Sequence, residues 1–390
     1  MTAPHLVSEA PTQIAAVGLF PGLLGEGGIQ EAGRHTAAAL DLIARRSHCR
    51  TCFLSLNDSK GMHSIATDGS EITFRGFGRD KLRFAVAAIR MARQGSARSA
   101  GRPPLLLAAH PNLALPAAVA RFFAPRCALA VQSHGIEVWR PLPFLRRRAI
   151  ASATLVLAPS HHTAQQLFSV QRIIESRIAV LPWPLSWEFF RFAACPDELP
   201  LPAGFPTGRV ILTVGRLDSS ERYKGTDALL LALSRLRPSF RDLHLGVVGR
   251  GSDLPRLRQL AANLGVSECV HFFGGLSREA LAACYARSEI FALPSTGEGF
   301  GLVFLEAMAF AKPLVAVAAG GSPDLVQDGI NGLLVPPHDP EKLSASLSLL
   351  LSDGELRFAL GRRGAERVRH SHRFEVFVSD LDQIMSARLK

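Results

Sequence analysis

The 390-residue sequence lacks features that mark several large classes of protein. No apolar run approaches the roughly 18 residues that a membrane-spanning helix needs. The N-terminal stretch MTAPHLVSEAPTQ has no basic segment followed by an apolar one, so we expect no signal peptide. Only 2 Tyr and 3 Trp are present, too few for the stacking platform of a single-strand nucleic-acid binder. We therefore expect a globular, cytoplasmic protein that does not act on nucleic acid.

Cysteine is also sparse, with 6 residues in the chain. Cys49 and Cys52 form a C-x-x-C pair, which redox and zinc sites use. No second pair is present, and no Cys/His set has zinc spacing. The apolar run around Cys52 is typical of a buried strand. We therefore interpret these cysteines as reduced thiols of a cytoplasmic protein.

Positive charge is abundant but unevenly distributed. The net charge is +11, and residues 1–190 hold 21 Lys/Arg against 11 Asp/Glu, whereas residues 191–390 hold 23 against 22. The basic residues concentrate from Arg79 to Arg102 and at Arg146–Arg148. Such a cluster suits an anionic membrane surface, nucleic acid or a phosphorylated substrate, or it is a solvated face.

Strand-like and helix-like segments alternate through both halves, which predicts two doubly wound, Rossmann-like parallel sheets covered by helices. We predict a first domain over 1–195, a Pro-rich linker over 196–208, a second domain over 209–373, and a helix over 374–390 that packs back on the first domain. Ligands of such sheets bind at the carboxyl ends of the strands, so a cleft between the domains is the expected site. The clearest predicted strands are Ile14–Phe20, Cys52–Leu56, Leu105–Ala109, Leu129–Gln132, Leu155–Ala158, Arg209–Gly215, Leu243–Val248, Val270–Phe273, Ile290–Leu293 and Pro313–Val317.

The strongest functional pattern is PSTGEGFGLVFLEAMAF, which separates Glu298 and Glu306 by seven residues. Gly299 and Gly301 allow a tight backbone at a helix start, where free N–H groups bind phosphate. Glu306 is expected about two turns into that helix, facing a ribose, and Glu298 is expected to meet sugar hydroxyls. The alternative is a capped helix with two solvent-facing acids, but the apolar residues around Glu306 argue against it.

A second pattern, VGRLDSSERYKG, places Arg216 after a predicted strand and Lys224 before a predicted helix. Two cations at a strand end suit a diphosphate leaving group, whose charge grows as its bond to the sugar breaks. Taken alone, an ordinary surface pair of cations explains them better.

Two weaker patterns lie in the first half. Gly27 and Gly28 belong to a glycine-rich loop after the first strand, although the G-x-G-x-x-G frame is missing. His134 follows another predicted strand, where it could bind a sugar hydroxyl or organise charge, and His110 is a similar candidate. A lone histidine is more often structural.

In this order, the motifs resemble those of the GT-B glycosyltransferases of family 4, which contain retaining mannosyl-, glucosyl- and N-acetylglucosaminyltransferases. The resemblance is strongest over 210–343, through GRLDSSERYKG, LGVVGRGSDLP, HFFGGLSREALAACYARSEIFALPS, EGFGLVFLE and AAGGSPDLV. Asp324 stands where the family usually has Glu. LPWPLSWEFF replaces the family's Pro-Asn-Gly-Val-Asp, so no role is carried onto it.

The resemblance implies a retaining, metal-independent transfer of a hexosyl group from a GDP- or UDP-sugar to a glycan or lipid-linked acceptor. It assigns Arg216 and Lys224 to the diphosphate, Glu298 to the sugar and Glu306 to the ribose. It further implies that Gly27 and Gly28 approach the diphosphate, that His134 contacts the sugar, and that N–H groups around the helix start bind the donor, which involves Gly299, Phe300, Gly301, Leu302 and Val303. A sugar-nucleotide epimerase of the same fold and an inactive nucleotide-sugar-binding protein are the alternatives.

The basic first half also suggests where the acceptor lies. On a helix, Leu82, Val86 and Ile89 share one face that is surrounded by Arg and Lys side chains. We hypothesise peripheral contact with anionic lipid on the inner face of the cell membrane. The alternative is a helix packed on its own sheet with a solvated basic edge.

Overall fold

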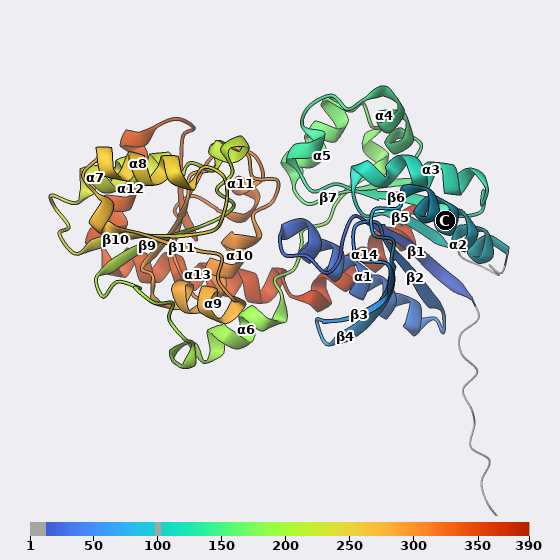
Figure 1. The fold of residues 1–390 in the computed structure, drawn as a ribbon, viewed down its shortest axis with the longest axis horizontal. Helices are drawn as coiled ribbons and strands as arrows, with labels where there is room; N and C mark the ends of the chain where they lie inside the picture. The colour runs from blue at the N-terminus through green and yellow to red at the C-terminus, as the bar shows by residue number, and fades with distance from the viewer. Residues whose placement is uncertain (1–12, 98–102, 390) are drawn as a thin grey trace, which may run out of the picture. The chain divides into compact units, whose positions relative to one another are not determined.

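The computed structural model describes residues 13–97 and 103–389, which form two α/β units (Figure 1). The first unit contains the residues up to Ala158, Ala164–Leu181 and the residues from Phe377 onward. The second contains Pro159–Thr163 and Pro182–Val376. The sequence predictions about the N-terminal stretch and about the basic residues Arg98 and Arg102 lie outside the described residues. Within 13–97 and 103–389, no helix is long and apolar enough to cross a membrane.

The first unit is built on an eight-stranded sheet in the order β3-β4-β2-β1-β5-β6-β7-β8. Neighbouring strands are parallel except for β3 and β4, which form an antiparallel hairpin. The strand order reverses between β1 and β5, which makes their loops a topological switch point. The strands are β1 (Ile14–Phe20), β2 (Arg50–Ser55), β3 (Gly61–Thr67), β4 (Ser70–Gly76), β5 (Leu105–Ala108), β6 (Ala128–Gln132), β7 (Leu155–Ala158) and β8 (Ile178–Val180).

The second unit has a six-stranded parallel sheet in the order β11-β10-β9-β12-β13-β14. Counted from β9, this is the order 3-2-1-4-5-6 of the dinucleotide-binding fold, with its switch point between β9 and β12. The strands are β9 (Arg209–Val214), β10 (Leu243–Val248), β11 (Val270–Gly274), β12 (Ile290–Leu293), β13 (Leu314–Val317) and β14 (Gly332–Val335).

Helices bury apolar faces against both sheets. In the first unit, α2, α3 and α4 place Phe84, Ala117, Ile150 and their neighbours in one core with β1, β5 and β6. In the second, Leu230, Leu347 and Leu360 pack with β9 and β10. The helices are α1 (Gly28–Arg46), α2 (Lys81–Ala97), α3 (Ala114–Phe122), α4 (Phe144–Ala151), α5 (His161–Ser169), α6 (Trp187–Ala194), α7 (Thr226–Leu236), α8 (Leu254–Asn263), α9 (Arg278–Arg287), α10 (Leu302–Ala309), α11 (Ser322–Leu325), α12 (Pro340–Ser352), α13 (Gly354–Ser371) and α14 (Phe374–Arg388).

The structure adds elements that the sequence analysis missed, and the hairpin β3–β4 is the clearest case. Its exposed strand β3 alternates between exposed and half-buried residues, so it lacks the apolar runs of the central strands. The turn at Asp68 and Gly69 has positive φ at both residues, 46° and 74°. An Asp-Gly pair between alternating segments is a strong hairpin signal, and it was available in the sequence.

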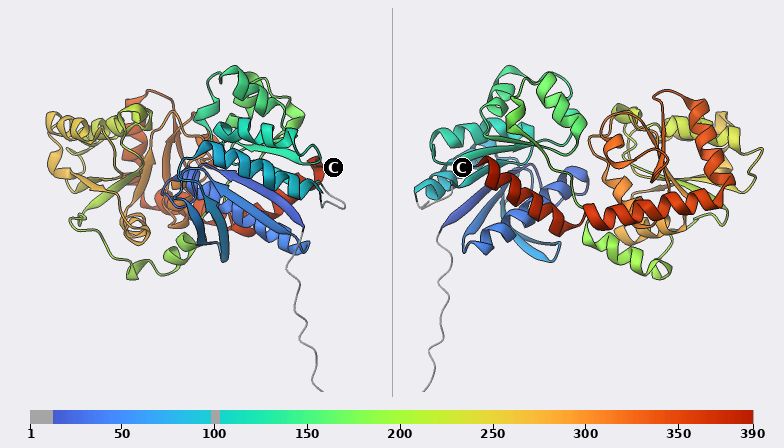
Figure 2. Two further views of the ribbon diagram at one scale, coloured as in Figure 1. Left: turned by 45° about the vertical axis from the view of Figure 1, so that its right-hand side comes forward. Right: turned by 180° about the vertical axis from the view of Figure 1, so that it is seen from behind.

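The division between the units differs from the predicted linker over 196–208. Contacts divide the chain after Leu181 instead, so residues 182–195 belong to the second unit. The reason is α6, whose Phe189 ring packs on Tyr285 of α9 at 6.3 Å and whose Glu188 pairs with Arg278 at 2.7 Å. The last helix, α14, passes from the second unit to the first, and its residues from Phe377 onward join the first unit (Figure 2).

Candidate active site

The switch point of the second sheet carries the predicted cations and the first predicted acid. Arg216 and Lys224 follow β9, and Glu298 follows β12. Ligands of open parallel sheets bind where loops leave the carboxyl ends of such strands. The backbone fastens these two loops together, because the N–H of Thr296 donates to the carbonyl of Tyr223 at 2.9 Å. Both loops are therefore held together before any ligand arrives.

Lys224 and Glu298 form a largely buried ion pair. Lys224 Nζ donates to Glu298 Oε1 at 2.7 Å, and the two side chains are 17% and 11% exposed. Burial lowers the pKa of Lys224, but the charge and hydrogen bond of Glu298 outweigh burial, so the pKa is raised overall. Lys224 is therefore a cation at neutral pH, held at a fixed position.

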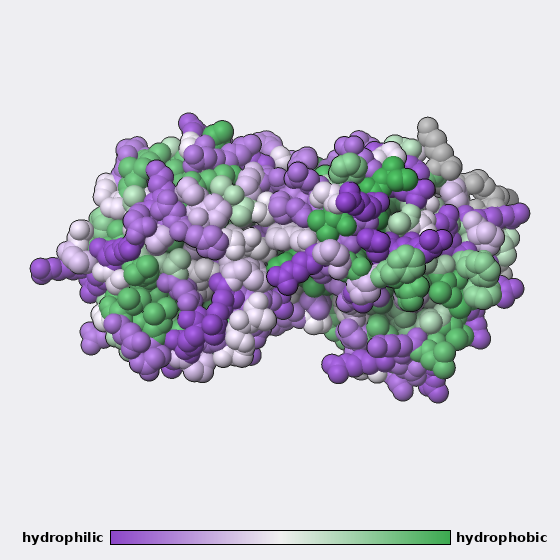
Figure 3. All heavy atoms as spheres, turned by 90° about the horizontal axis from the view of Figure 1, so that it is seen from above, coloured by the Kyte–Doolittle hydropathy of each residue, from purple (hydrophilic) through white to green (hydrophobic). Residues whose placement is uncertain are grey.

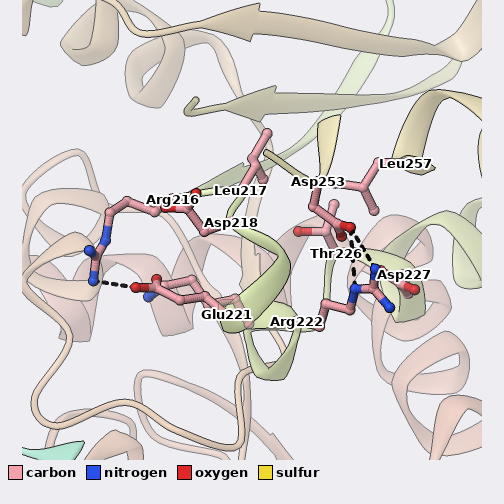
Figure 4. Close-up of a pocket in the computed structure, with 11 residues that line it drawn as sticks. Arg216, Leu217, Asp218, Glu221, Arg222, Thr226, Asp227, Asp253 and Leu257 are labelled. Atoms are coloured by element: carbon pink, nitrogen blue, oxygen red, sulfur yellow. Dashed lines mark hydrogen bonds and ion pairs between the residues drawn. The ribbon is translucent and has the colours of Figure 1, made fainter. Parts of the chain in front are cut away.

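Arg216 presents its guanidinium to solvent beside this pair. Its side chain is 70% exposed and pairs with Glu221, which is 11% exposed. Figure 4 shows this pair on one side of a small pocket, with Asp253 accepting from Arg222 on the other side. Arg216 and Lys224 both line the pocket. An exposed guanidinium can bind two oxygens of a phosphate at once.

The start of α10 is shaped for close approach of a ligand. Gly301 has φ 97°, and a Cβ there would lie 2.5 Å from the Phe304 ring, so only glycine fits. The first N–H groups of a helix have no partner within it, which leaves those of Leu302 and Val303 directed outward. Gly299 and Phe300 lead into this start, and the Gly299 carbonyl accepts from Ser160 Oγ at 2.7 Å.

Glu306 lies nearer the helix start than the sequence analysis placed it. Because α10 begins only at Leu302, after the left-handed Gly301, Glu306 is about one turn into the helix rather than two. Its Oε2 accepts from the hydroxyl of Tyr285 at 2.7 Å. Burial, and then the neighbouring Glu306 carboxylate, raise the pKa of Tyr285. The Tyr285 hydroxyl is therefore protonated and donates a hydrogen bond to Glu306, which is not a solvent-facing surface acid.

The glycine loop of the first unit follows β1 and is fixed from two directions. Asp58 Oδ2 accepts from the N–H of Leu23 at 2.7 Å, and Arg34 Nη1 donates to the carbonyls of Leu23 and Gly25, each at 2.9 Å. Gly27 caps α1 with φ 125°, an angle that residues with a side chain rarely adopt, and Gly28 is the first helical residue. This loop is preorganised, with its backbone at the N-terminus of α1.

His134 follows β6 and lies buried against His110, which follows β5; their rings are 5.4 Å apart. His134 Nε2 bonds to the carbonyl of Ala109 at 2.8 Å. Burial lowers the pKa of His134 to about 4, although the Ala109 hydrogen bond opposes the shift. Burial, together with the neighbouring His134, also lowers the pKa of His110 to about 4. His134 is therefore neutral at pH 7, which leaves it able to hydrogen-bond a hydroxyl but not to stabilise negative charge as a cation.

The predicted residues thus fall into two groups. In the second unit, Arg216 and Lys224 line one pocket and Lys224 pairs with Glu298, whereas Glu306 lies on α10, which follows β12, and contacts Tyr285. Gly27, Gly28 and His134 lie at the carboxyl edge of the first sheet, after β1 and β6. The cleft between the domains stays a prediction.

No group of three or more His, Cys, Asp or Glu in 13–97 and 103–389 could hold a metal ion. The one Asp-x-Asp sequence, Asp380 and Asp382 around buried Leu381, lies on α14. Residues two apart on a helix point in different directions, which does not suit joint binding of one ion. Cys49 and Cys52 are half-buried free thiols.

Several supporting residues were missed by sequence reasoning. Tyr285 and Ser160 act from distant positions in the chain, so no local pattern marks them. Glu221 lies within the Arg216–Lys224 segment, where an acid between two cations was a usable signal. Arg34 and Asp58 hold the glycine loop by hydrogen bonds. The signal in the sequence was the position of Arg34 among small and apolar residues of α1.

Comparison with known proteins finds a family match over the part of the second unit that holds the candidate site. The sequence profile of the family Glycosyl transferases group 1 matches residues 202–367. A D-inositol 3-phosphate glycosyltransferase of Corynebacterium jeikeium is 41% identical over 160 residues, covering 39% of this chain and 38% of that protein. A GDP-mannose-dependent alpha-(1-6)-phosphatidylinositol monomannoside mannosyltransferase of Mycolicibacterium smegmatis is 32% identical over 274 residues, covering 67% of this chain and 70% of that protein.

Solved structures share the fold along nearly the whole chain. The UDP complex of HepE from Anabaena has a TM-score of 0.72 at 18% identity, covering 95% of this chain and 99% of that one. Sucrose-phosphate synthase from Thermosynechococcus elongatus has a TM-score of 0.72 at 20% identity, covering 96% and 98%. The GT-B fold predicted from the sequence is confirmed, and with a relative above 30% identity over most of its length, the chain belongs to the group 1 glycosyltransferases.

Proposed function

We propose that this chain is a retaining hexosyltransferase that takes its sugar from a GDP- or UDP-sugar. The observation that carries the proposal is the 2.7 Å pair of Lys224 Nζ and Glu298 Oε1 at the switch point of the second sheet. A cation there suits a diphosphate, and a carboxylate beside it suits sugar hydroxyls. The pair spans two loops that a nucleotide sugar would have to contact together.

In the proposed reaction, the bond between the anomeric carbon and the diphosphate oxygen breaks, and its electron pair stays on the diphosphate. The acceptor oxygen bonds to the same face of the sugar, and its proton passes to a phosphate oxygen, so the anomeric configuration is kept. Lys224, Arg216 and the N–H groups at the start of α10 stabilise the growing negative charge. Fixed donors of this kind accelerate reactions because they need no reorganisation as charge develops.

The remaining residues bind and orient the donor in this proposal. Glu298 accepts hydrogen bonds from the transferred sugar, and Glu306, oriented by Tyr285, accepts from the ribose diol. The fixed loop at Gly27 and Gly28 brings backbone N–H groups to the diphosphate. His134, which is neutral at pH 7, hydrogen-bonds a sugar hydroxyl.

For the acceptor, we propose a lipid-linked molecule or a growing glycan that carries phosphorylated inositol. The names of both kinds of relative contain this group, once as a free phosphate and once within a lipid. The strongly basic first half of the chain is consistent with a phosphorylated acceptor. We further propose that the protein works in the cytoplasm, in peripheral contact with the anionic inner face of the cell membrane.

A thermal-shift screen of GDP-mannose, UDP-glucose and UDP-N-acetylglucosamine is the first test, because a bound donor stabilises the folded state. The donor that binds is then incubated with inositol 3-phosphate or phosphatidylinositol, and the product's anomeric configuration is read by NMR. We expect a product that keeps the donor's configuration, at a rate that EDTA does not change.

The same assay separates the alternatives. An epimerase converts the donor without any acceptor, so a changed sugar nucleotide in an acceptor-free reaction would favour it. An inactive binding protein shows a thermal shift without turnover of any donor. An inverted product, or a rate lost with EDTA, would contradict the retaining or metal-independent part of the proposal.

A further inference from the structure

The helices α2, α3 and α4, together with Phe123 directly after α3, expose eight large apolar side chains. These helices pack beside one another on the first sheet, with their small and buried residues in its core. Their outer faces carry side chains that are between 42% and 80% exposed, led by Phe122 at 80% and Leu82 at 76%. We call this set the α2–α4 surface; it consists of Leu82, Val86, Leu115, Val119, Phe122, Phe123, Phe144 and Leu145.

The exposed residues follow helical spacing, so they form stripes rather than scattered points. Leu82 and Val86 are one turn apart on α2, and Leu115, Val119 and Phe122 are successive turns of one face of α3. The rings of Phe122 and Phe123 pack edge to face at 5.4 Å. Figure 3 shows apolar groups gathered between hydrophilic ones over the first unit. Exposed apolar stripes on neighbouring helices are typical of an interaction site.

The charge of the same helices selects the partner. Within α2, α3 and α4 the sequence has 8 Lys or Arg and no Asp or Glu. The acids that precede or separate these helices in the sequence are already engaged, since Asp80 pairs with Arg83 at 3.5 Å and Glu137 accepts from the N–H of His134 at 2.6 Å. A second copy of this surface would bring like charges together, and a nucleic acid would leave the phenylalanines in water. An anionic lipid surface satisfies both features, because apolar side chains enter the acyl boundary while cations meet the headgroups.

We propose that the α2–α4 surface docks this protein on anionic membranes, with Phe122, Phe123, Phe144 and Leu145 inserted at the level of the acyl boundary. The hypothesis from the sequence placed the contact on one helix, α2, with an apolar face of Leu82, Val86 and Ile89 among cations. The structure extends it to α3 and α4, whose exposed side chains enlarge the apolar part. Phe84, Ala88 and Ala92 of α2 form the part that packs on the sheet instead. The inference rests on the proposed function only for the biological reason to reach a bilayer.

Sedimentation with vesicles tests the proposal without reference to activity. Vesicles of phosphatidylcholine alone are compared with vesicles that also contain phosphatidylglycerol. We expect binding to the anionic vesicles, weakened by salt. Phe122→Ser and Phe144→Ser should each lower it by about tenfold, because an inserted phenylalanine loses its burial. Arg90→Gln should lower it about fivefold on anionic vesicles only.

Phe358→Ser is the matched control, because Phe358 is 70% exposed but lies on α13 of the second unit. Its binding should equal that of the parent. Phe122→Trp gives a second measurement: its fluorescence should shift to the blue on anionic vesicles, whereas that of Phe358→Trp should not. Parental vesicle binding by Phe122→Ser, or an unshifted Phe122→Trp, would overturn the proposal.

Two other results would also overturn it. A dimer that Phe122→Ser dissociates would make the surface a contact between copies of this chain. Binding to duplex DNA as tight as to anionic vesicles, and unchanged in Phe122→Ser, would make a polyanion the partner. Loss of vesicle binding with transfer to a soluble acceptor intact leaves the proposed function standing, and vesicle binding without any transfer does the reverse.

Discussion

At the scale of single residues, the Lys224–Glu298 pair has two separable effects. It connects the loops after β9 and β12, which contributes to stability, and in the proposed function it also supplies groups for the donor. Removing one partner of a largely buried pair leaves an uncompensated charge, whereas replacing both partners by neutral groups is often tolerated. Stability and activity should therefore respond differently to single and double changes.

We expect Lys224→Met and Glu298→Gln each to lower stability by about 3 kcal/mol and the rate of transfer by about a thousandfold. The double variant should regain much of the stability but none of the activity. Unfolding temperature and initial rates measure the two quantities separately. Turnover near the parental rate in either single variant would contradict the assignment of these residues to the donor site.

A second residue-scale consequence concerns pH. The pKa of His134 in the folded protein is lowered to about 4 from an ordinary value near 6.5. The unfolded chain therefore binds the proton more readily, so this histidine's contribution is fully present above about 6.5 and is lost as pH falls towards 4. His134→Gln keeps an N–H donor for the Ala109 carbonyl but does not titrate.

We expect the unfolding temperature of His134→Gln to fall less between pH 6.5 and pH 4 than that of the parent. His48→Asn is the control, because His48 is exposed in the same unit and asparagine tolerates its φ of 52°. Calorimetry across this pH range measures the difference. Parallel curves for all three proteins would show that His134 does not carry the acid sensitivity.

At the scale of elements, the start of α10 depends on one backbone conformation. Gly301 turns the chain into the helix with φ 97°, which brings Gly299, Phe300 and the first N–H groups to the edge of the sheet. The centroids of the Trp183 and Phe300 rings lie 5.4 Å apart, and this contact also holds the loop before α10. The position of the helix start, rather than any one side chain, determines the expected phosphate contacts.

Gly301→Ala should weaken binding of GDP or UDP and lower stability by about 2 kcal/mol, because the added Cβ is strained by φ and meets the Phe304 ring. Gly204→Ala is the matched control, since Gly204 has φ 76° with open space around it. It carries the backbone strain alone and should leave nucleotide binding unchanged. Calorimetric titration and thermal unfolding measure the two effects, and equal nucleotide affinity in both variants would contradict the role of the helix start.

At the scale of the whole molecule, most of the last helix, α14, belongs to the same unit as the N-terminal half of the chain. Leu381 and Phe377 of α14 are 1% and 2% exposed, and these residues belong to the first unit. Leu360 of α13 is equally buried but belongs to the second. Two leucines only about twenty positions apart therefore stabilise different units.

Leu381→Ala should lower hydrogen-exchange protection in β1, β5 and β6, and Leu360→Ala should lower it in β9, β10 and β12. Each truncation of a buried leucine should cost about 2–5 kcal/mol in its own unit. Exchange measured by mass spectrometry locates the effect. If Leu381→Ala instead loosened the second sheet, the assignment of α14 to the first unit would be incorrect.

The sequence by itself determined the alternation of strands and helices and the family to which the chain belongs. Buried central strands such as Ile14–Phe20 are continuous apolar runs, so they can be predicted from the sequence alone. Arg216, Lys224, Glu298 and Glu306 could be predicted as site residues because their spacing around glycines is local, and their roles stay predictions. The GT-B fold was predicted from the order of these motifs. The excess of positive charge in the first half of the chain is a property of the sequence itself.

Only the tertiary structure decided which distant residues support those groups. Tyr285 meets Glu306, and α6 joins the second unit instead of the first, because packing of separate helices brings them together. The α3 and α4 parts of the α2–α4 surface could not be predicted from the sequence, because the exposure of Phe122 and Phe144 depends on which helical face the sheet buries. A local sequence pattern gives the type and spacing of residues, whereas the burial of a side chain and its contacts with distant residues depend on the whole fold.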